Sequence, residues 1–327
     1  MTAELSLSAK NPHERDARIA FEPVEHKYTI DGDPKISYTS VTTWNHGHFR
    51  EFDAVNIIRR MMASRNWKQS PYHGMTADAI KAAWDANRDA AAAAGTAMHY
   101  NIECHYNGLP IPPDDTEAPE FRYFLQFVQD HATKLRPYRT EWTVFDESVR
   151  ISGSIDMVFE NLGPTGEPDG TLSIYDWKRC KEIKKVPFGA QDYSHNPLIA
   201  HIPDTNYWHY CLQLNTYKAI LERCYGKRVT DLFLVCLHPD NKNGSYQCIR
   251  VADLQAEVAA LFKQRTEEQR TEEQRAEEQR TEEQRTEEQR AEEQRTEEQR
   301  TEEQRAKATD ATDATDATDA IKATKDN

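Results

Sequence analysis

The stretch RISGSIDMVFENLGPTGEPDGTLSIYDWK, residues 150–178, indicates two strands and the connection between them. Residues 150–160 and 171–177 follow the two-residue period of strands rather than the period of a helix. The intervening GPTGEPDG contains the Gly, Pro and Asp residues that favour hairpin turns. We therefore expect an antiparallel hairpin here.

Two carboxylates and a lysine stand out on this hairpin. Asp156 follows a Gly-Ser pair that lets another group approach closely, and Asp176 ends the second strand with Lys178 two residues beyond. In an antiparallel pairing the two carboxylates lie on one face at neighbouring positions, where they repel each other unless a cation separates them. Polar strand ends are common, so this pattern needs support from elsewhere in the chain.

Hard oxygen ligands of this kind suit Mg²⁺ or Mn²⁺. Lys178 shares the parity of Asp176, so its ammonium can reach a phosphate oxygen near the same ion. Two carboxylates and a lysine on adjacent strands are what metal-assisted phosphodiester hydrolysis requires, because the reaction needs an ion, an activated water and relief of developing charge.

The rest of the first 265 residues predicts a mixed α/β sheet flanked by helices. The expected helices are 49–65, 76–106, 118–135 and 205–224, and the further strands are 141–145, 231–237 and 246–251. Near the N-terminus, FEPVEHKYTIDGDPKISYTSVT (21–42) alternates apolar and polar residues and predicts a hairpin around its Asp-Gly-Asp turn.

One helix adds a candidate metal ligand. Gly95, His99 and Glu103 are spaced i, i+4, i+8 and share a helical face, on which Gly95 would permit close packing against the sheet. His99 would point its imidazole at the ion, and Glu141 could join from the first strand. A lone helical His is more often an ordinary surface or core residue.

The helix 205–224 carries Gln213 and Tyr217, again on one face. An amide and a phenol there could hold a phosphate or a base beside the metal. The alternative is a half-buried helix whose polar residues face solvent. His46, His48, His195 and His201 receive no role.

The ordered motifs GTAMH, GSID, DWK and QLNTY resemble the RecB-type branch of the PD-(D/E)XK nuclease superfamily over about residues 95–240. The resemblance implies a restriction-endonuclease-like αβββαβ core with helical N-terminal additions, which cuts DNA with one or two Mg²⁺ or Mn²⁺ ions. The HKYTIDG…SVT segment also looks like exonuclease-like proteins of large DNA viruses.

The resemblance also implies roles for individual residues. The catalytic residues would be Asp156, Asp176 and Lys178. The metal ligands would be His99, Asp156, Asp176 and the backbone carbonyl of Trp177, with Glu103 and Glu141 as further candidates. The residues that position DNA would be Gln213 and Tyr217. The basic residues Arg179, Lys181, Lys184 and Lys185 would follow the DNA backbone, or else form a solvated loop.

Composition divides the chain further. We expect an N-terminal hairpin and helical lobe at 1–94 packed on a core at 95–265, and then eight (T/A)EEQR pentads at 266–305. The pentads form an extended charged helix or are disordered, and the ATD-repeat tail at 306–327 is expected to be disordered. This tail either recruits a protein partner or has no required role.

Charge and cysteine content constrain the class of protein. Of the net charge of −14, the pentads contribute −8 and the last 22 residues −2, so the core is near −4 and permits a DNA partner. The six cysteines lack zinc-ligand spacing, which favours isolated thiols. The sequence has no signal peptide and no long apolar run, so we expect a soluble, non-secreted protein of the cytoplasm or nucleus, including that of a virus-infected cell.

The leading hypothesis is a metal-dependent DNA exonuclease acting in repair, recombination or viral genome processing. The alternatives are a structure-specific endonuclease and, from another class, a catalytically weak DNA-binding or scaffold protein. A Ser/His/Asp hydrolase is disfavoured because the sequence contains no GxSxG motif.

Overall fold

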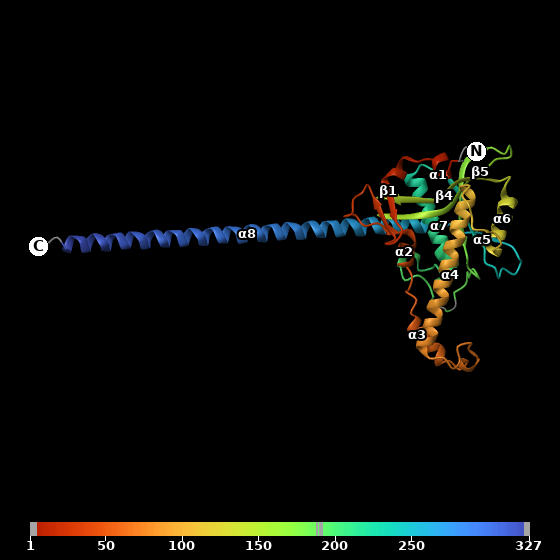
Figure 1. Cartoon of the computed structure of the whole chain (residues 1–327), viewed down its shortest axis with the longest axis horizontal. Coiled ribbons are helices and arrows are strands. Elements are labelled where there is room, and N and C mark those ends of the chain that lie inside the picture. The colour runs from red at the N-terminus through yellow and green to blue at the C-terminus, as the bar shows by residue number, and fades with distance from the viewer. Residues whose placement is uncertain (1–4, 188, 190–191, 324–327) are drawn as a thin grey trace. The chain divides into compact units, whose positions relative to one another are not determined.

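The structure, a computed structural model, describes residues 5–187, 189 and 192–323 (Figure 1). The chain divides into two compact units, Met1–Gln264 and Arg265–Asn327. The predicted boundary between residues 94 and 95 lies inside the helix α4 (Ala77–Tyr106), so the N-terminal residues and the sheet belong to one unit.

Strands and helices alternate along the first unit. The strands are β1 (Ile19–Glu22), β2 (Lys27–Ile30), β3 (Thr39–Ser40), β4 (Leu135–Asp146), β5 (Ile151–Leu162), β6 (Pro168–Lys178), β7 (Val229–Cys236) and β8 (Gln247–Arg250). The helices are α1 (Leu7–Lys10), α2 (Val41–His46), α3 (Ala54–Met62), α4, α5 (Pro113–Thr116), α6 (Pro119–His131), α7 (Asn206–Cys224) and α8 (Gln255–Ala323), which continues into the second unit.

Six strands form one mixed sheet, as expected for an α/β protein. β4, β5 and β6 are antiparallel neighbours, β7 runs parallel to β6, and β8 is antiparallel to β7. The short β3 pairs in parallel with the first two residues of β5. Because parallel strands need a crossover, α7 makes the connection from β6 to β7.

Helices cover both faces of the sheet. Ile174 of β6 packs in the apolar cluster that contains α2 and α7, whereas its neighbours Tyr175 and Trp177 pack in the cluster that contains α4 and α6. Successive residues of a strand point to opposite faces, so Asp176 has the parity of Ile174 and lies on the α7 side. The alternation of buried residues on β6 thus determines which helix faces the carboxylate.

The N-terminal hairpin exists, but the predicted turn was wrong. Ile19 pairs with Ile30 and Glu22 with Lys27, so the turn is at residues 23–26 and not at the Asp-Gly-Asp segment. The Glu22 carboxylate accepts hydrogen bonds from the backbone N–H groups of residues 24 and 25, which stabilises the turn there.

The expected role of Gly95 was also wrong. A Cβ atom built on Gly95 meets nothing within 4 Å, so this glycine does not bring α4 close to the sheet. The close approach occurs instead at Gly153 of β5. A Cβ atom there would lie 2.8 Å from the hydroxyl oxygen of Tyr217 and 2.9 Å from its Cε1.

Replacing Gly153 with Ala is therefore expected to lower the free energy of unfolding by about 1–3 kcal/mol, since the buried Tyr217 ring has to move. Urea denaturation measures this change. Gly163→Ala is the matched control, because its Cβ atom meets its nearest neighbour at an ordinary 3.5 Å. Equal losses in both variants would contradict a specific clash with Tyr217.

The second unit continues the helix α8 through the pentads. Thr271 and the equivalent threonines donate hydrogen bonds from their hydroxyls to the carbonyl four residues earlier. The helix also runs through the ATD triads to Ala323, where we had expected disorder. Alanine recurs at every third position in these triads, and it has the highest helix propensity of all residues.

Candidate metal centre

Three carboxylates stand in a row across neighbouring strands. Thr140 pairs with Met157 and Trp142 with Ile155, which places Glu141 of β4 opposite Asp156 of β5. Met157 pairs with Tyr175, so the next position on β6, Asp176, adjoins Asp156 on its other side. The expected neighbour relation of Asp156 and Asp176 is confirmed, and the register adds Glu141 to the row.

Glu141 has an unusual backbone at this point. Its φ angle is 42°, in the left-handed region that non-glycine residues rarely occupy. The Ser154 hydroxyl donates a 2.8 Å hydrogen bond to its carboxylate and so helps hold the side chain toward β5. Strained backbone at a cluster of carboxylates is typical of functional sites.

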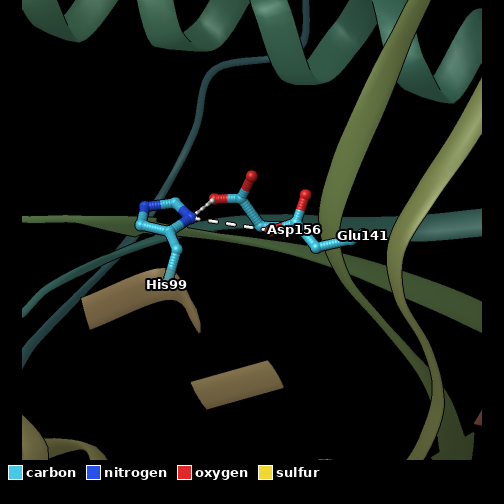
Figure 2. A group of neighbouring side chains, drawn as sticks. All are labelled: His99, Glu141 and Asp156. Carbon is cyan, nitrogen blue, oxygen red and sulfur yellow. Dashed lines mark ion pairs between the residues drawn. The ribbon is translucent and has the colours of Figure 1, made fainter. Parts of the chain in front are cut away.

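His99 of α4 completes the group. Figure 2 shows its imidazole facing the two carboxylates, with Nδ1 3.5 Å from Asp156 Oδ2 and 3.8 Å from Glu141 Oε1. One donor atom from each of these three residues lies within 4.8 Å of the others, which is close enough for a single ion to contact all three. The chain thus brings together ligands from a helix and two strands.

The close approach of several carboxylates shifts the pKa values of the groups in this cluster. Burial raises the pKa of Asp156 to about 7, and the negative charge of Asp176 adds to this shift. Burial would lower the pKa of His99, but Asp156 and Glu141 outweigh it and raise the value to about 9. The raised pKa values show that this cluster of carboxylates favours added positive charge.

Lys178 supplies another positive charge. Its Nζ lies 2.7 Å from Asp176 Oδ2, and the Asp176 side chain is only 3% exposed. The ammonium also lies 4.7 Å from the ring centroid of Tyr210, a cation–π contact from α7. Burial alone would lower the pKa of Lys178, but Asp176 and Asp156 raise it, so the side chain keeps its proton.

Two further predicted ligands lie beside this group. The Trp177 N–H donates a 3.0 Å hydrogen bond to Asp156 Oδ2. The carbonyl of the same residue points to the same side of the strand. Burial raises the pKa of Glu103, and the charge of Glu141 raises it further. Glu103 therefore lies near the row of carboxylates, although the group that can share one ion consists of His99, Glu141 and Asp156.

Gln213 and Tyr217 occupy different environments. Tyr217 is buried, with its ring against Gly153 and its hydroxyl hydrogen-bonded to Gln213. Gln213 itself lines a cavity of about 350 Å³ that also reaches Lys178. Tyr217 therefore packs under strand β5 and supports the site, whereas the Gln213 amide lines the cavity beside Lys178.

The basic residues after β6 differ in their accessibility. Arg179 is partly buried and donates to Glu120 of α6 at 2.7 Å. The other three are on the surface: Lys181 pairs with Asp240 at 3.0 Å, Lys184 lies 3.6 Å from Glu182, and Lys185 lies 4.4 Å from the ring centroid of Tyr207. Arg179 thus fastens the end of β6 to α6, while the three lysines face solvent.

A second group of potential ligands, Asp146, Glu147 and Cys224, has a structural role instead. Arg15 forms a 2.5 Å ion pair with Glu147, and Asp146 accepts from the hydroxyl and the backbone N–H of Ser148. Side chains of the protein already neutralise or hydrogen-bond these acids.

A scan against protein-family models and a search of curated proteins found no match to this chain. None of the helices in the described part of the chain combines the length and the apolar character that a membrane span requires. All six cysteines are free thiols, as expected from their spacing.

The pKa of His99 predicts that the metal-free protein loses stability as the pH rises. The folded-state pKa of about 9 exceeds the ordinary 6.5, so the protonated ring stabilises the folded chain fully below pH 6.5. That contribution disappears as the pH passes 9. In EDTA, we expect the free energy of unfolding to fall by about 1–2 kcal/mol between these values, as measured by urea denaturation.

Other groups also titrate in this range, so the comparison with His99→Gln isolates the effect. The difference in stability between wild type and variant should shrink as the pH rises from 6.5 to 9.5. A difference that does not depend on pH would show that the histidine is not held protonated by its neighbours.

Proposed function

We propose that this protein is a metal-dependent DNA nuclease that acts as an exonuclease, and that the row of carboxylates with His99 and Lys178 is its active site. The observation that carries the proposal is the shared position of these groups. Glu141, Asp156 and Asp176 lie side by side on three strands, His99 approaches from α4, and Lys178 is 2.7 Å from Asp176.

The residues present fit a Mg²⁺ or Mn²⁺ ion. Asp156 and Glu141 offer hard oxygens, His99 offers a nitrogen, and Asp176 and the Trp177 carbonyl adjoin them. Burial and the negative charge of Asp176 raise the pKa of Asp156, so a cation at this position would be favourable. When bound, the ion supplies positive charge to the phosphate and lowers the pKa of an attacking water.

The protein's own groups provide orientation and charge. Lys178 remains protonated, so its role is to stabilise negative charge on the phosphate oxygens rather than to remove a proton. The cation–π contact with Tyr210 holds the ammonium in place. Gln213 presents its amide to the neighbouring cavity, where it can contact the strand that carries the phosphate.

The element order supports membership of the PD-(D/E)XK superfamily and a restriction-endonuclease-like core. Apart from α5 and α6, which lie between α4 and β4, the elements α4, β4–β6, α7 and β7 follow the αβββαβ order of that core. By this proposal, DNA is the partner, and repair, recombination or viral genome processing is the setting. The surface lysines Lys181, Lys184 and Lys185 would contact phosphates, while Arg179 holds β6 in position.

The test uses the full chain with an end-labelled linear duplex, a labelled single strand and a closed circular duplex. Each is incubated with Mg²⁺, Mn²⁺ or EDTA, and the wild type is compared with Asp176→Asn. Asp240→Asn is the matched control, since that carboxylate is exposed and pairs with Lys181 outside the centre.

Metal-dependent loss of the linear substrates alone, absent in Asp176→Asn and retained in Asp240→Asn, is the expected result. Cutting of the circle would assign an endonuclease instead. Activity that survives in Asp176→Asn would mean that the site is wrong. DNA binding without cleavage in any lane would favour the scaffold alternative.

A further inference from the structure

A cavity lies next to the proposed active site, between α2 and α7. Its volume is about 350 Å³, near the lower end of the range of roughly 300–1,000 Å³ for small-ligand pockets. The lining residues are Thr42, Asn45, His46, Lys178, Asn206, His209, Tyr210 and Gln213. Lys178 lines this cavity and also contacts Asp176 of the carboxylate row, so a group bound here is adjacent to the proposed site of cleavage.

Asn45 indicates that a ligand belongs in this cavity. The residue is only 1% exposed, and its Oδ1 accepts a long, 3.5 Å hydrogen bond from the Thr216 hydroxyl. Among the residues that the structure describes, its Nδ2 has no hydrogen-bond partner. A buried amide donor without an acceptor is costly, and an acceptor atom on a bound molecule would remove that cost.

Aromatic rings form another side of the cavity. The rings of His46 and His209 have centroids 5.4 Å apart, and His209 lies 4.0 Å from Phe49. Asp204 holds the His209 ring through a 2.9 Å contact to Nε2. Burial lowers the pKa of His209 despite this carboxylate, so the ring is a neutral surface rather than a cation.

The chemistry of the lining favours a flat, uncharged heterocycle over a free phosphate. Lys178 is the one lysine of the lining, and Asp176 already pairs with it. The amides of Asn45 and Gln213 can donate to and accept from the edge of a base, as such side chains do in nucleic-acid recognition. The aromatic rings of His46 and His209 next to these amides suit base stacking.

We propose that this cavity receives one unpaired nucleobase of the strand being cut, next to the scissile phosphate. The inference rests on the proposed nuclease function and defines its substrate more narrowly. A base can enter the cavity only after leaving the duplex, which costs a few kcal/mol unless the strand is already single. The enzyme should therefore act on single-stranded or frayed ends in preference to blunt duplex.

The test measures binding and cleavage separately. Fluorescence anisotropy in EDTA gives the affinity for a short labelled oligothymidylate and for a series in which one nucleotide at a time is abasic. For the wild type, we expect one abasic position to weaken binding by about 5- to 100-fold, the range for loss of one stacked base. Cleavage of the same series in Mg²⁺ then shows whether that position adjoins the cut.

Asn45→Leu removes the amide but keeps a side chain of similar size. In this variant the abasic position should weaken binding much less than it does in the wild type. Because Asn45 is buried, His46→Ala at the exposed rim is a second variant with less risk to folding. His73→Ala, an exposed histidine outside the cavity, is the matched control and should retain the full penalty.

Equal affinity of the wild type for intact and abasic strands at every position would overturn the proposed base site. So would inorganic phosphate that displaces the oligonucleotide from wild type but not from Asn45→Leu, since the cavity would then bind phosphate. A failure of the nuclease proposal itself would give a result different from these two outcomes. In that case no substrate is cleaved with metal, although the anisotropy experiment can still be evaluated.

Discussion

Lys178→Gln is expected to lower kcat for DNA cleavage by about 10²- to 10³-fold while divalent-ion binding persists. The ammonium is 2.7 Å from Asp176 and is held over the Tyr210 ring, so it can reach a phosphate without serving as a metal ligand. Its removal withdraws a positive charge from the buried Asp176. Stabilisation by Mn²⁺ should therefore be larger in the variant than in the wild type.

Single-turnover cleavage and thermal unfolding with and without Mn²⁺ separate the two effects. Lys181→Gln is the control, since this lysine is 75% exposed and pairs with Asp240 at the surface; its kcat should change by no more than about twofold. A Lys178→Gln variant that no longer responds to Mn²⁺ would assign the lysine to organising the metal centre. Full activity would remove it from the mechanism.

Asp156→Asn is expected to abolish the stabilisation of the protein by the ion. It should also lower the cleavage rate about 10³-fold, which corresponds to about 4 kcal/mol in the activation barrier. Asp156 stands between Glu141 and Asp176 and is 3.5 Å from His99, so every ion position in this row depends on it. Asparagine keeps an oxygen that can accept from the Trp177 N–H, so the variant should still fold.

Isothermal titration with Mn²⁺ and thermal unfolding measure the loss of binding. Glu160→Gln, on the same strand but paired with Arg136, is the matched control and should bind the ion as the wild type does. If Asp156→Asn retained Mn²⁺ affinity, the ion would have to be bound elsewhere in the chain, and the assignment of the centre would be wrong.

Much of the fold around this centre could be predicted from local sequence. Residues 76–106 and 205–224 have helical periodicity, and they correspond closely to α4 and α7. The full length of β4 was harder to predict from the sequence, because Pro137 and an irregular register between Pro137 and Arg139 interrupt its first half. A proline is tolerated there because β4 pairs only with β5 and forms an edge of the sheet.

Several features of the site could not be predicted from the sequence, because long-range packing decides the surroundings of a side chain. Nothing near Arg179 in the sequence indicates that Glu120, 59 residues earlier, neutralises it. Tyr217 was expected at the DNA, but its ring is buried against Gly153 of another element. The cavity joins α2 to α7 across more than 160 residues, and neither segment carries a signal for it.

The hairpin of β5 and β6 and the neighbouring positions of Asp156 and Asp176 follow from the sequence alone, because strand parity and turn chemistry are local properties. The same parity predicts that Lys178 lies on the face of Asp176, and in the structure its ammonium is 2.7 Å from that carboxylate. His99 and Glu141 were candidate ligands from their motifs, but their contacts with this row of carboxylates are apparent only in the three-dimensional structure. Those contacts depend on the register of β4 and on the packing of α4 against the sheet, which are fixed by the burial of apolar faces far apart in the chain.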